Sequence, residues 1–424
     1  MVGPLGDRIV TLAMELTGCA VAAALAGLVG SRSRWIALVL TLAFLLLGCL
    51  VAVQLLQSAV PLAPHWVSGM GTLRPTRIAA GLLLGAVAAM GLEVLVAGDA
   101  APTSPAQAVL LALVGAAFCL LSTESLVVVA VAAGALTGAV WLRWQRLLGP
   151  QLPVRSAARQ SVLVFSSWLA AAAVVPGVRT GSSPPVLAAV VIGLALTGLV
   201  GAMPFSVWVG VATRMGRPEA LYWRLLFLPA GALLEARAIA LSPAAVAGPL
   251  REILIGLGLA TALFWGARGL LGPDQGRYFR SLACDSGLIC VGIALGTVDG
   301  LAAALVLVVL HWLSGAVLSD PGGTRPQLLA WIGLSGLPPF GGFTGRVMVV
   351  LAAVSFSPTL AALLLLVGGL QLGVAATGMR SILATGRGQL SRGAELLGLG
   401  VALLTLVLGL VPVPAVQLLF GVRP

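Results

Sequence analysis

The sequence predicts an all-α, polytopic membrane protein with about 14 transmembrane helices. Its mean hydropathy is +1.10, and 59% of its 424 residues are hydrophobic. Only 9% of the residues are charged, whereas soluble domains carry about 25%. Apolar runs of roughly 17 to 25 residues, each long enough to cross a bilayer, recur from end to end. The loops between them are short, so we expect one transmembrane domain and no soluble redox or nucleotide-binding domain.

The apolar runs give the approximate positions of the spans. The first run lacks a small-residue cleavage site and is therefore expected to be a retained helix. Two runs are long and interrupted, one by Pro204 and one by Pro338-Pro339, and a break in each half predicts two inverted-repeat halves. We expect N-terminal helices over 1–104, halves over 105–240 and 241–378, and a C-terminal helix and tail over 379–424. The expected spans are 9–29, 35–56, 77–97, 106–122, 124–142, 160–176, 185–212, 220–240, 250–271, 281–297, 301–318, 327–355, 358–378 and 395–411.

The second interruption is the most informative segment of the chain. From Gly333 to Arg346 it holds two prolines and five glycines in fourteen residues, which cannot continue an α-helix. A broken helix at membrane depth survives only where it is buried in protein or lines a hydrated cavity. Broken helices of this kind recur in transporters, so the segment indicates ion transport or its remains.

The formal charge of +11 comes from arginine alone, because all 24 basic residues are Arg. With the N-terminus outside, sixteen arginines fall in inward loops, Arg224 among them, and six fall on the outward side. This positive-inside bias predicts an even number of spans with both termini outside, in a bacterial inner membrane. It also explains the charge without nucleic acid as a partner.

Four stretches follow one another in a recognisable order: Arg155-Ser-Ala-Ala158, Leu199 to Trp208, Ser281 to Gly292, and Leu-Ser-Gly-Leu-Pro-Pro-Phe-Gly-Gly-Phe-Thr-Gly-Arg at 334–346. Together they resemble the proton-conducting, antiporter-like membrane subunits of respiratory complex I, membrane-bound hydrogenases and multisubunit cation/proton antiporters. The last stretch is similar to that family's Gly-Ile-Pro-Pro-x-x-Gly-Phe-x-Gly-Lys motif. The resemblance covers about residues 105–355 and is closest to the N-type subunit of complex I, mitochondrial subunit 2.

The departures from this family lie at the residues that the resemblance would assign to proton transfer. The family's fifth-helix glutamate falls on Ala133, its seventh-helix lysine on Leu199 and its eighth-helix lysine on Ala230. A histidine becomes Ser206, a lysine four residues after His311 becomes Gly315, and the Gly-Lys of the twelfth helix becomes Gly345-Arg346. Buried lysine can release a proton near neutral pH, whereas arginine cannot be deprotonated in a protein. We therefore expect a subunit that keeps the fold and has lost or altered its proton path.

The candidate proton-path residues are the ionisable side chains within apolar runs, since charge at bilayer depth is costly. They are His311, Glu235, Glu124, Asp285 and Arg346. His311 is the best remaining proton-handling group, because imidazole titrates near neutrality, although a histidine satisfied by a backbone carbonyl is the simpler alternative. Glu235 is expected to pair with an arginine on another helix and Asp285 to be capped or paired. Arg346 is expected to balance Glu124, Glu235 or Asp285.

Two functions from different classes fit these features. The first is a membrane-arm subunit of a complex I-like or hydrogenase-type redox complex, a non-redox scaffold whose partner subunits would carry out any electron transfer. The second is a subunit of a cation/proton antiporter or an inorganic-carbon uptake transporter, and an unrelated transporter with similar proline breaks is a third alternative. No cofactor is expected, because the sequence has no cysteine cluster, dinucleotide loop or metal-spaced histidine pair. The expected partners are other membrane subunits and the lipid bilayer.

Overall fold

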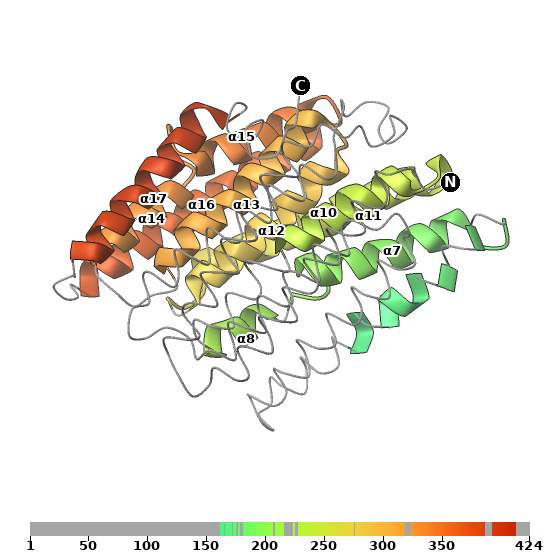
Figure 1. The fold of residues 1–424 in the computed structure, drawn as a ribbon, viewed down its shortest axis with the longest axis horizontal. Coiled ribbons are helices and arrows are strands. Elements are labelled where there is room, and N and C mark those ends of the chain that lie inside the picture. The colour runs from blue at the N-terminus through green and yellow to red at the C-terminus, as the bar shows by residue number, and fades with distance from the viewer. Residues whose placement is uncertain are drawn as a thin grey trace, which may run out of the picture.

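The computed structural model describes about half of the chain, between residues 162 and 412, where the residues form helices joined by short turns (Figure 1). Glu124, Ala133 and the expected spans up to residue 142 lie outside the described residues. The described residues are 162–164, 166–171, 173–174, 177–178, 181–206, 208–215, 224, 228–274, 276–318, 324–385 and 392–412.

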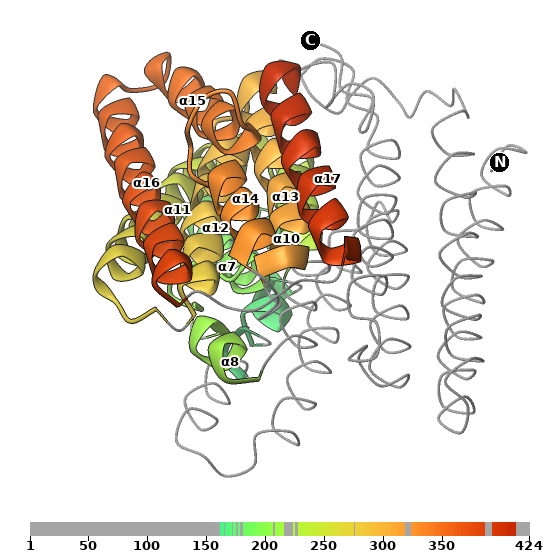
Figure 2. The same ribbon diagram turned by 90° about the vertical axis from the view of Figure 1, so that its left-hand side faces the viewer.

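The described helices coincide with the expected spans from the seventh to the fourteenth. They are α7 (Pro185–Val200), α8 (Trp208–Met215), α10 (Leu228–Leu241), α11 (Ala244–Leu271), α12 (Arg277–Ala294), α13 (Val298–Leu318), α14 (Thr324–Leu334), α15 (Gly341–Val354), α16 (Pro358–Thr385) and α17 (Arg392–Leu410). Three segments in this part of the chain are long and apolar enough to cross a membrane: Ala244–Leu271, Val298–Gly315 and Pro358–Ala384. Figure 2 shows α13, α14, α16 and α17 side by side in one bundle, with α15 above α14.

The first expected helix break is present at Pro204. Helix α7 ends at Val200, where Gly201 takes the left-handed conformation with φ of 77°, and α8 begins at Trp208. The polar groups of the break are bound by protein. The amide of Met203 donates to Thr261 Oγ1 at 2.8 Å, and the indole N–H of Trp208 donates to the carbonyl of Gly201 at 2.9 Å. Two polar groups of the break are thus bonded within the protein, as irregular backbone at membrane depth requires, while Pro204 itself is exposed at the surface of the bundle.

The second expected break, at Pro338-Pro339, separates α14 from α15. Gly336 has a φ of 78°, which favours glycine, and the Ser335 hydroxyl accepts a hydrogen bond from the amide of Leu337 at 3.2 Å. The carbonyl of Leu334, which the end of α14 leaves without a helical partner, accepts a hydrogen bond from Arg346 Nη1 at 2.7 Å. One buried guanidinium thus caps the helix that the prolines end.

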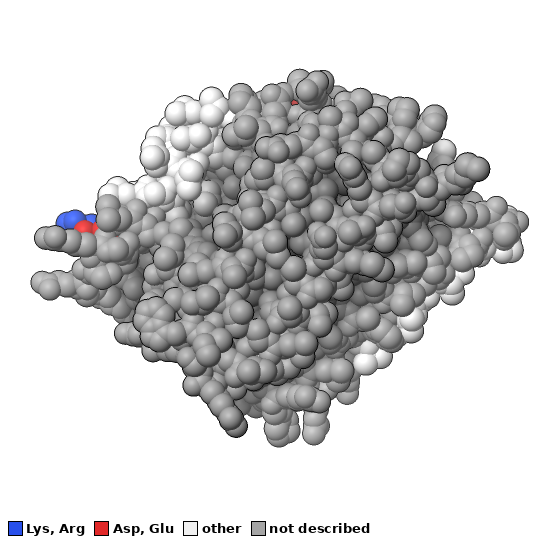
Figure 3. All heavy atoms as spheres, viewed as in Figure 1, with Lys and Arg blue, Asp and Glu red and all other residues white. Residues whose placement is uncertain are grey.

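Helices α12 and α13 form the centre of the described bundle. Nearly every residue of α12 is buried. In the most apolar stretch of α13, 78% of the residues are buried, whereas only 39% are buried in the corresponding stretches of α11 and α16. The outer helices expose leucines such as Leu365, Leu366, Leu403 and Leu404. On the face in Figure 3, the described surface is mostly uncharged. An apolar perimeter around a polar-containing centre is the arrangement expected of a bundle in lipid.

Helices α11 and α12 approach closely through glycine. A Cβ added at Gly287 would lie 2.7 Å from the backbone nitrogen of Ala262 and closer still to the carbonyl oxygen of Gly258. The obstacle is backbone, which cannot move aside as the end of a flexible side chain can. Small residues at such crossings let transmembrane helices pack tightly, and here they bring α12 against α11.

We expect Gly287→Ala to destabilise the protein by about 1 to 3 kcal/mol, because the added methyl group overpacks this crossing. Thermal unfolding of the purified chain in detergent measures the effect. Gly256→Ala on α11 is the matched control, since a Cβ there meets nothing within 4 Å. Equal melting temperatures for the two variants would contradict the close packing of α11 and α12.

Candidate functional site: a buried carboxylate, guanidinium and imidazole

Asp285 of α12 is the centre of a buried polar cluster. Its carboxylate is fully buried, and Arg346 of α15 binds both of its oxygens, with Nη2 at 2.8 Å from Oδ2 and Nε at 3.2 Å from Oδ1. A guanidinium that binds a carboxylate through two parallel hydrogen bonds is among the strongest polar contacts in proteins. Arg346 also caps Leu334, so this one side chain connects α12 to both sides of the helix break.

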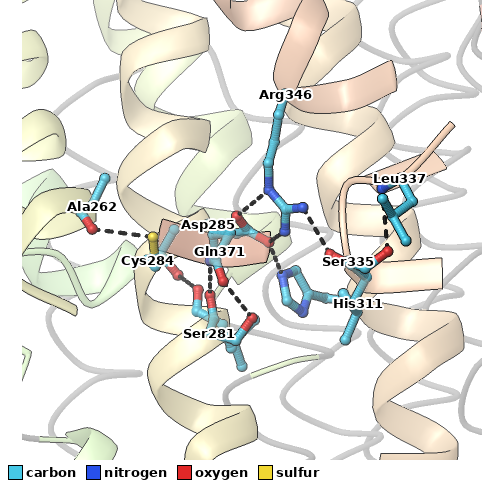
Figure 4. A network of polar contacts seen from close by, with 12 residues as sticks. Ala262, Ser281, Cys284, Asp285, His311, Ser335, Leu337, Arg346 and Gln371 are labelled. Carbon is cyan, nitrogen blue, oxygen red and sulfur yellow. Dashed lines mark hydrogen bonds and ion pairs between the residues drawn. The ribbon is translucent and has the colours of Figure 1, made fainter. Parts of the chain in front are cut away.

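Two more side chains complete the cluster from α13 and α16 (Figure 4). His311 Nε2 lies 2.9 Å from Asp285 Oδ2, and Gln371 Nε2 donates to Asp285 Oδ1 at 3.1 Å. The Gln371 amide is itself fixed, because it donates to the carbonyl of Ser281 at 2.9 Å and accepts from the Ser281 hydroxyl at 3.0 Å. Helices α12, α13, α15 and α16 therefore meet at one carboxylate.

The chemistry of this cluster is set by its one fixed charge. Guanidinium does not lose its proton in a protein, so Arg346 supplies a fixed positive charge beside the Asp285 carboxylate, and His311 Nε2 contacts the same carboxylate from α13. Moving a proton to His311 would make the cluster net positive in a low-dielectric site, where uncompensated charge is costly. The cluster is therefore held together by the compensation between the Asp285 carboxylate and the Arg346 guanidinium, and this pair lies at the helix break that Arg346 caps.

The structure brings together three residues that the sequence analysis considered separately. Asp285 is paired, as expected, and its partner among the described residues is Arg346, so Arg346 balances Asp285 rather than Glu235. The alternative in which a backbone carbonyl satisfies His311 is wrong within the part of the chain that the structure describes. His311 Nε2 contacts the carboxylate, and its buried Nδ1 has no hydrogen-bond partner there. Their part in proton transfer stays a prediction.

Among the described residues, no arginine is hydrogen-bonded to Glu235, although the sequence analysis expected such a pair. It lies fully buried on α10, and neither of its carboxylate oxygens has a hydrogen bond of ordinary geometry to a described residue. The thiol of Cys290, on α12, is the polar group beside it. A carboxylate buried without an ion-pair partner is costly, so Glu235 is a group whose presence at this depth the described contacts do not explain.

Sequence reasoning missed four residues around the cluster. Ser281 and Gln371 are uncharged, so a search for ionisable residues passed over them, although a lone amide within the apolar run 358–378 was a signal. Tyr278 and Arg224 were also missed. Arg224, assigned to an inward loop, is only 1% exposed, because its side chain lies against the Tyr278 hydroxyl inside the bundle.

At the positions where the family resemblance places lysines, this chain has an apolar side chain or a glycine. Leu199 and Ala230 are buried among aliphatic side chains of the main core. At Gly315, a Cβ would collide with the hydroxyl of Tyr278 and with Nη1 of Arg224. The space beside Gly315 thus holds a cation that comes from another part of the chain. Among the described residues, no group of three or more His, Cys, Asp and Glu side chains could hold a metal ion.

Comparison with solved structures shows that the chain shares its fold with chains of several multisubunit membrane complexes. One chain of the Mrp complex from Dietzia sp. DQ12-45-1b matches with a TM-score of 0.74 and 20% identity, over 97% of this chain and 51% of that one. A chain of respiratory complex I from Thermus thermophilus with bound NADH matches with a TM-score of 0.75 and 18% identity, over 96% of this chain and 98% of that one.

A third match widens the class. A chain of the membrane-bound sulfane sulfur reductase, an archaeal respiratory membrane complex, has a TM-score of 0.71 and 16% identity, over 91% of this chain and 75% of that one. The chain spans about half the length of the matching Mrp-complex chain. No family model and no curated protein matches the sequence. The class that the comparisons define is thus an all-helical membrane fold shared by chains of these complexes.

We expect Asp285→Asn to destabilise the protein by about 3 kcal/mol or more, because it leaves Arg346 buried without its counter-charge. Arg346→Met should cost a similar amount, since it leaves the carboxylate unpaired. The double variant should cost clearly less than the sum of the two, because it removes both charges together. Unfolding of the four proteins in detergent tests this, and strictly additive costs would contradict a direct pair.

Proposed function

We propose that the chain is an antiporter-like membrane-arm subunit of a complex I-like or hydrogenase-type redox complex, with a scaffold role and an altered proton path. Redox centres would belong to partner chains. The supporting observation is the buried Asp285–Arg346–His311 cluster at the second helix break, within a fold that chains of complex I and of the sulfane sulfur reductase share. The proposal includes two inverted-repeat halves, about 14 spans and both termini outside a bacterial inner membrane.

An altered path fits the side chains better than a lost one. In the expected first half, 105–240, the two positions where the family resemblance places lysines are occupied by Leu199 and Ala230. Both side chains are aliphatic, so a relay of lysines cannot operate there. The second half keeps an imidazole, a carboxylate and a fixed cation within hydrogen-bond distance of one another. An ionisable residue buried at membrane depth is a candidate for an ion pathway, and a structural ion pair is the alternative. Proton handling would then be confined to the α12–α13–α15 region.

A second candidate is a subunit of a cation/proton antiporter or an inorganic-carbon uptake transporter. The match over 97% of this chain to a chain of an Mrp complex favours it. The cluster would serve the same chemistry in both cases, so the two candidates differ in their partners. The identity of the co-assembled chains separates them, because a redox complex needs iron–sulfur subunits and a transporter does not.

We expect affinity purification of the tagged chain from its own host to recover other antiporter-like chains together with iron–sulfur chains. Mass spectrometry of the mildly solubilised complex identifies them. Recovery with membrane subunits alone would favour the transporter, and recovery of the chain by itself would contradict both candidates.

We also expect Asp285→Asn and His311→Gln to lower proton uptake by vesicles that contain the purified complex roughly tenfold or more, because each removes a proton-handling group. A pH-sensitive dye inside the vesicles reports the initial rate. Glu252→Gln is the matched control, since Glu252 is exposed on α11 and away from the cluster. Unchanged rates in both cluster variants, with the complex intact, would leave only the scaffold role.

A further inference from the structure

Ser314, three residues after His311 on α13, has a buried hydroxyl group without a hydrogen bond. The residue is 0% exposed, and its Oγ has no hydrogen-bond partner in the part of the chain that the structure describes. Buried hydroxyls on neighbouring helices behave differently. Thr261 of α11 and Ser286 of α12 each donate to a carbonyl one turn back in their own helix, at 2.6 and 2.9 Å. The hydroxyl of Ser314 does not make the equivalent bond, so it is available to another group.

A second buried polar atom lies on the same side of α13. His311 Nδ1 has no hydrogen-bond partner among the described residues. Residues three apart on an α-helix are neighbours on its surface, with Cβ atoms about 5–6 Å apart. The Ser314 side chain leans toward the turn that carries His311, because every Cα–Cβ bond of a helix tilts toward the helix N-terminus. Two unsatisfied polar groups are thus neighbours in the buried centre of the bundle.

The contact at the other ring nitrogen decides which nitrogen of His311 carries the proton. Nε2 lies 2.9 Å from Asp285 Oδ2, and Arg346 binds both oxygens of that carboxylate (Figure 4). A carboxylate that faces a guanidinium has only acceptors to offer, so Nε2 is the N–H donor of this contact. In a neutral imidazole Nδ1 then has a lone pair, and a buried lone pair needs a donor.

The other polar side chains around His311 are engaged elsewhere. From α12, the Tyr278 hydroxyl donates at 3.4 Å to the main-chain carbonyl of His311 and not to its ring. From α15 and α16, Arg346 and Gln371 are bound to the carboxylate at 2.8 and 3.1 Å. Ser314 is therefore the described side chain within one helical turn of His311 that has a hydroxyl to offer to Nδ1.

We propose that one ordered water bridges Ser314 Oγ and His311 Nδ1, and that this contact fixes the imidazole with its N–H on Nε2, toward Asp285. The two groups are not bonded directly, and buried polar atoms of this kind are usually satisfied by water. Ser314 is thus a positioning residue, which acts on the carboxylate through the imidazole. Its part in proton handling rests on the proposed function, whereas the arrangement of hydrogen bonds does not.

This arrangement gives the His311 ring two chemically distinct sides. Nε2 faces the carboxylate of Asp285, which is held by Arg346, whereas Nδ1 faces a water and a hydroxyl, each of which can donate or accept a hydrogen bond. The hydrogen bond at one ring nitrogen commonly sets the tautomer and the role of the other. Within the proposed function, a proton would exchange with water on the Ser314 side of the ring and with the carboxylate on the Asp285 side.

Nitrogen NMR of isotope-labelled histidine tests this arrangement, because the chain has only two histidines. His65→Gln leaves His311 as the single imidazole of the parent protein. The full chain is placed in lipid nanodiscs at a pH where the ring is neutral, and couplings to the ring C–H protons distinguish Nε2 from Nδ1. We expect the proton on Nε2, a hydrogen-bonded Nδ1 without a proton, and transfer of magnetisation from water to the Nδ1 resonance.

Ser314→Ala should move the Nδ1 resonance downfield by several parts per million, toward the position of a nitrogen without a hydrogen bond. Nε2 should keep its proton, because Asp285 is still there to accept it. Ser314→Thr retains a hydroxyl and should restore the parent Nδ1 resonance. Ser286→Ala is the matched control and should leave Nδ1 unchanged, because Ser286 is fully buried next to Asp285 in the sequence and its hydroxyl is bonded to its own helix.

Three outcomes would overturn the inference. A neutral ring with its proton on Nδ1 would mean that Nε2 does not donate to the carboxylate, and this measurement needs no Ser314 variant to fold. An Nδ1 resonance that is the same with and without the Ser314 hydroxyl would mean that another group serves Nδ1. No transfer from water in the parent protein would remove the bridging water. None of these depends on the proton-uptake assay, so failure here and failure of the proposed function are distinguishable.

Discussion

The contact between Arg346 and Asp285 is the constraint on which the rest of the described structure depends. Proline and glycine end α14, and that end leaves the carbonyl of Leu334 without a helical partner inside the bundle. Arg346 satisfies it and is itself balanced by Asp285 at 2.8 Å. A broken helix, a buried cation and a buried anion would each be costly alone. Together they stabilise one another, so the break and the cluster belong to one arrangement.

The same reasoning explains how a chain without lysine can keep charged and polar side chains buried at membrane depth. Arginine cannot release its proton, so it serves as a fixed charge around which other groups titrate. Arg346 and Arg224 occupy the interior in this manner, and His311 and Tyr278 are the side chains between them. The buried polar groups of the described bundle therefore include imidazole, carboxylate and guanidinium, with no amine among them.

The fold could be predicted in most of its described features. The apolar runs located α7 to α17 with boundaries that differ by up to about eight residues, because membrane depth allows few alternatives to helix. Pro204 and Pro338-Pro339 located both breaks, since proline cannot continue a helix interior. The site was predicted in part. Asp285, His311 and Arg346 were identified as costly residues within spans, and Asp285 was one of three candidate partners for Arg346. The sequence could not choose among those candidates or bring His311 to the same carboxylate, because the three residues lie on different helices and sequence spacing carries no information about contacts between helices.

The sequence by itself determined the helical membrane architecture, the two breaks and the set of charges that had to be buried, because hydropathy and backbone chemistry act locally. Only the tertiary structure decided how those charges are arranged. It took Arg224 from an expected loop into the space beside Gly315, left Glu235 beside a thiol, and joined Ser281 and Gln371 to the carboxylate. Pairing of this kind depends on which helix faces meet, and packing of the whole bundle sets that.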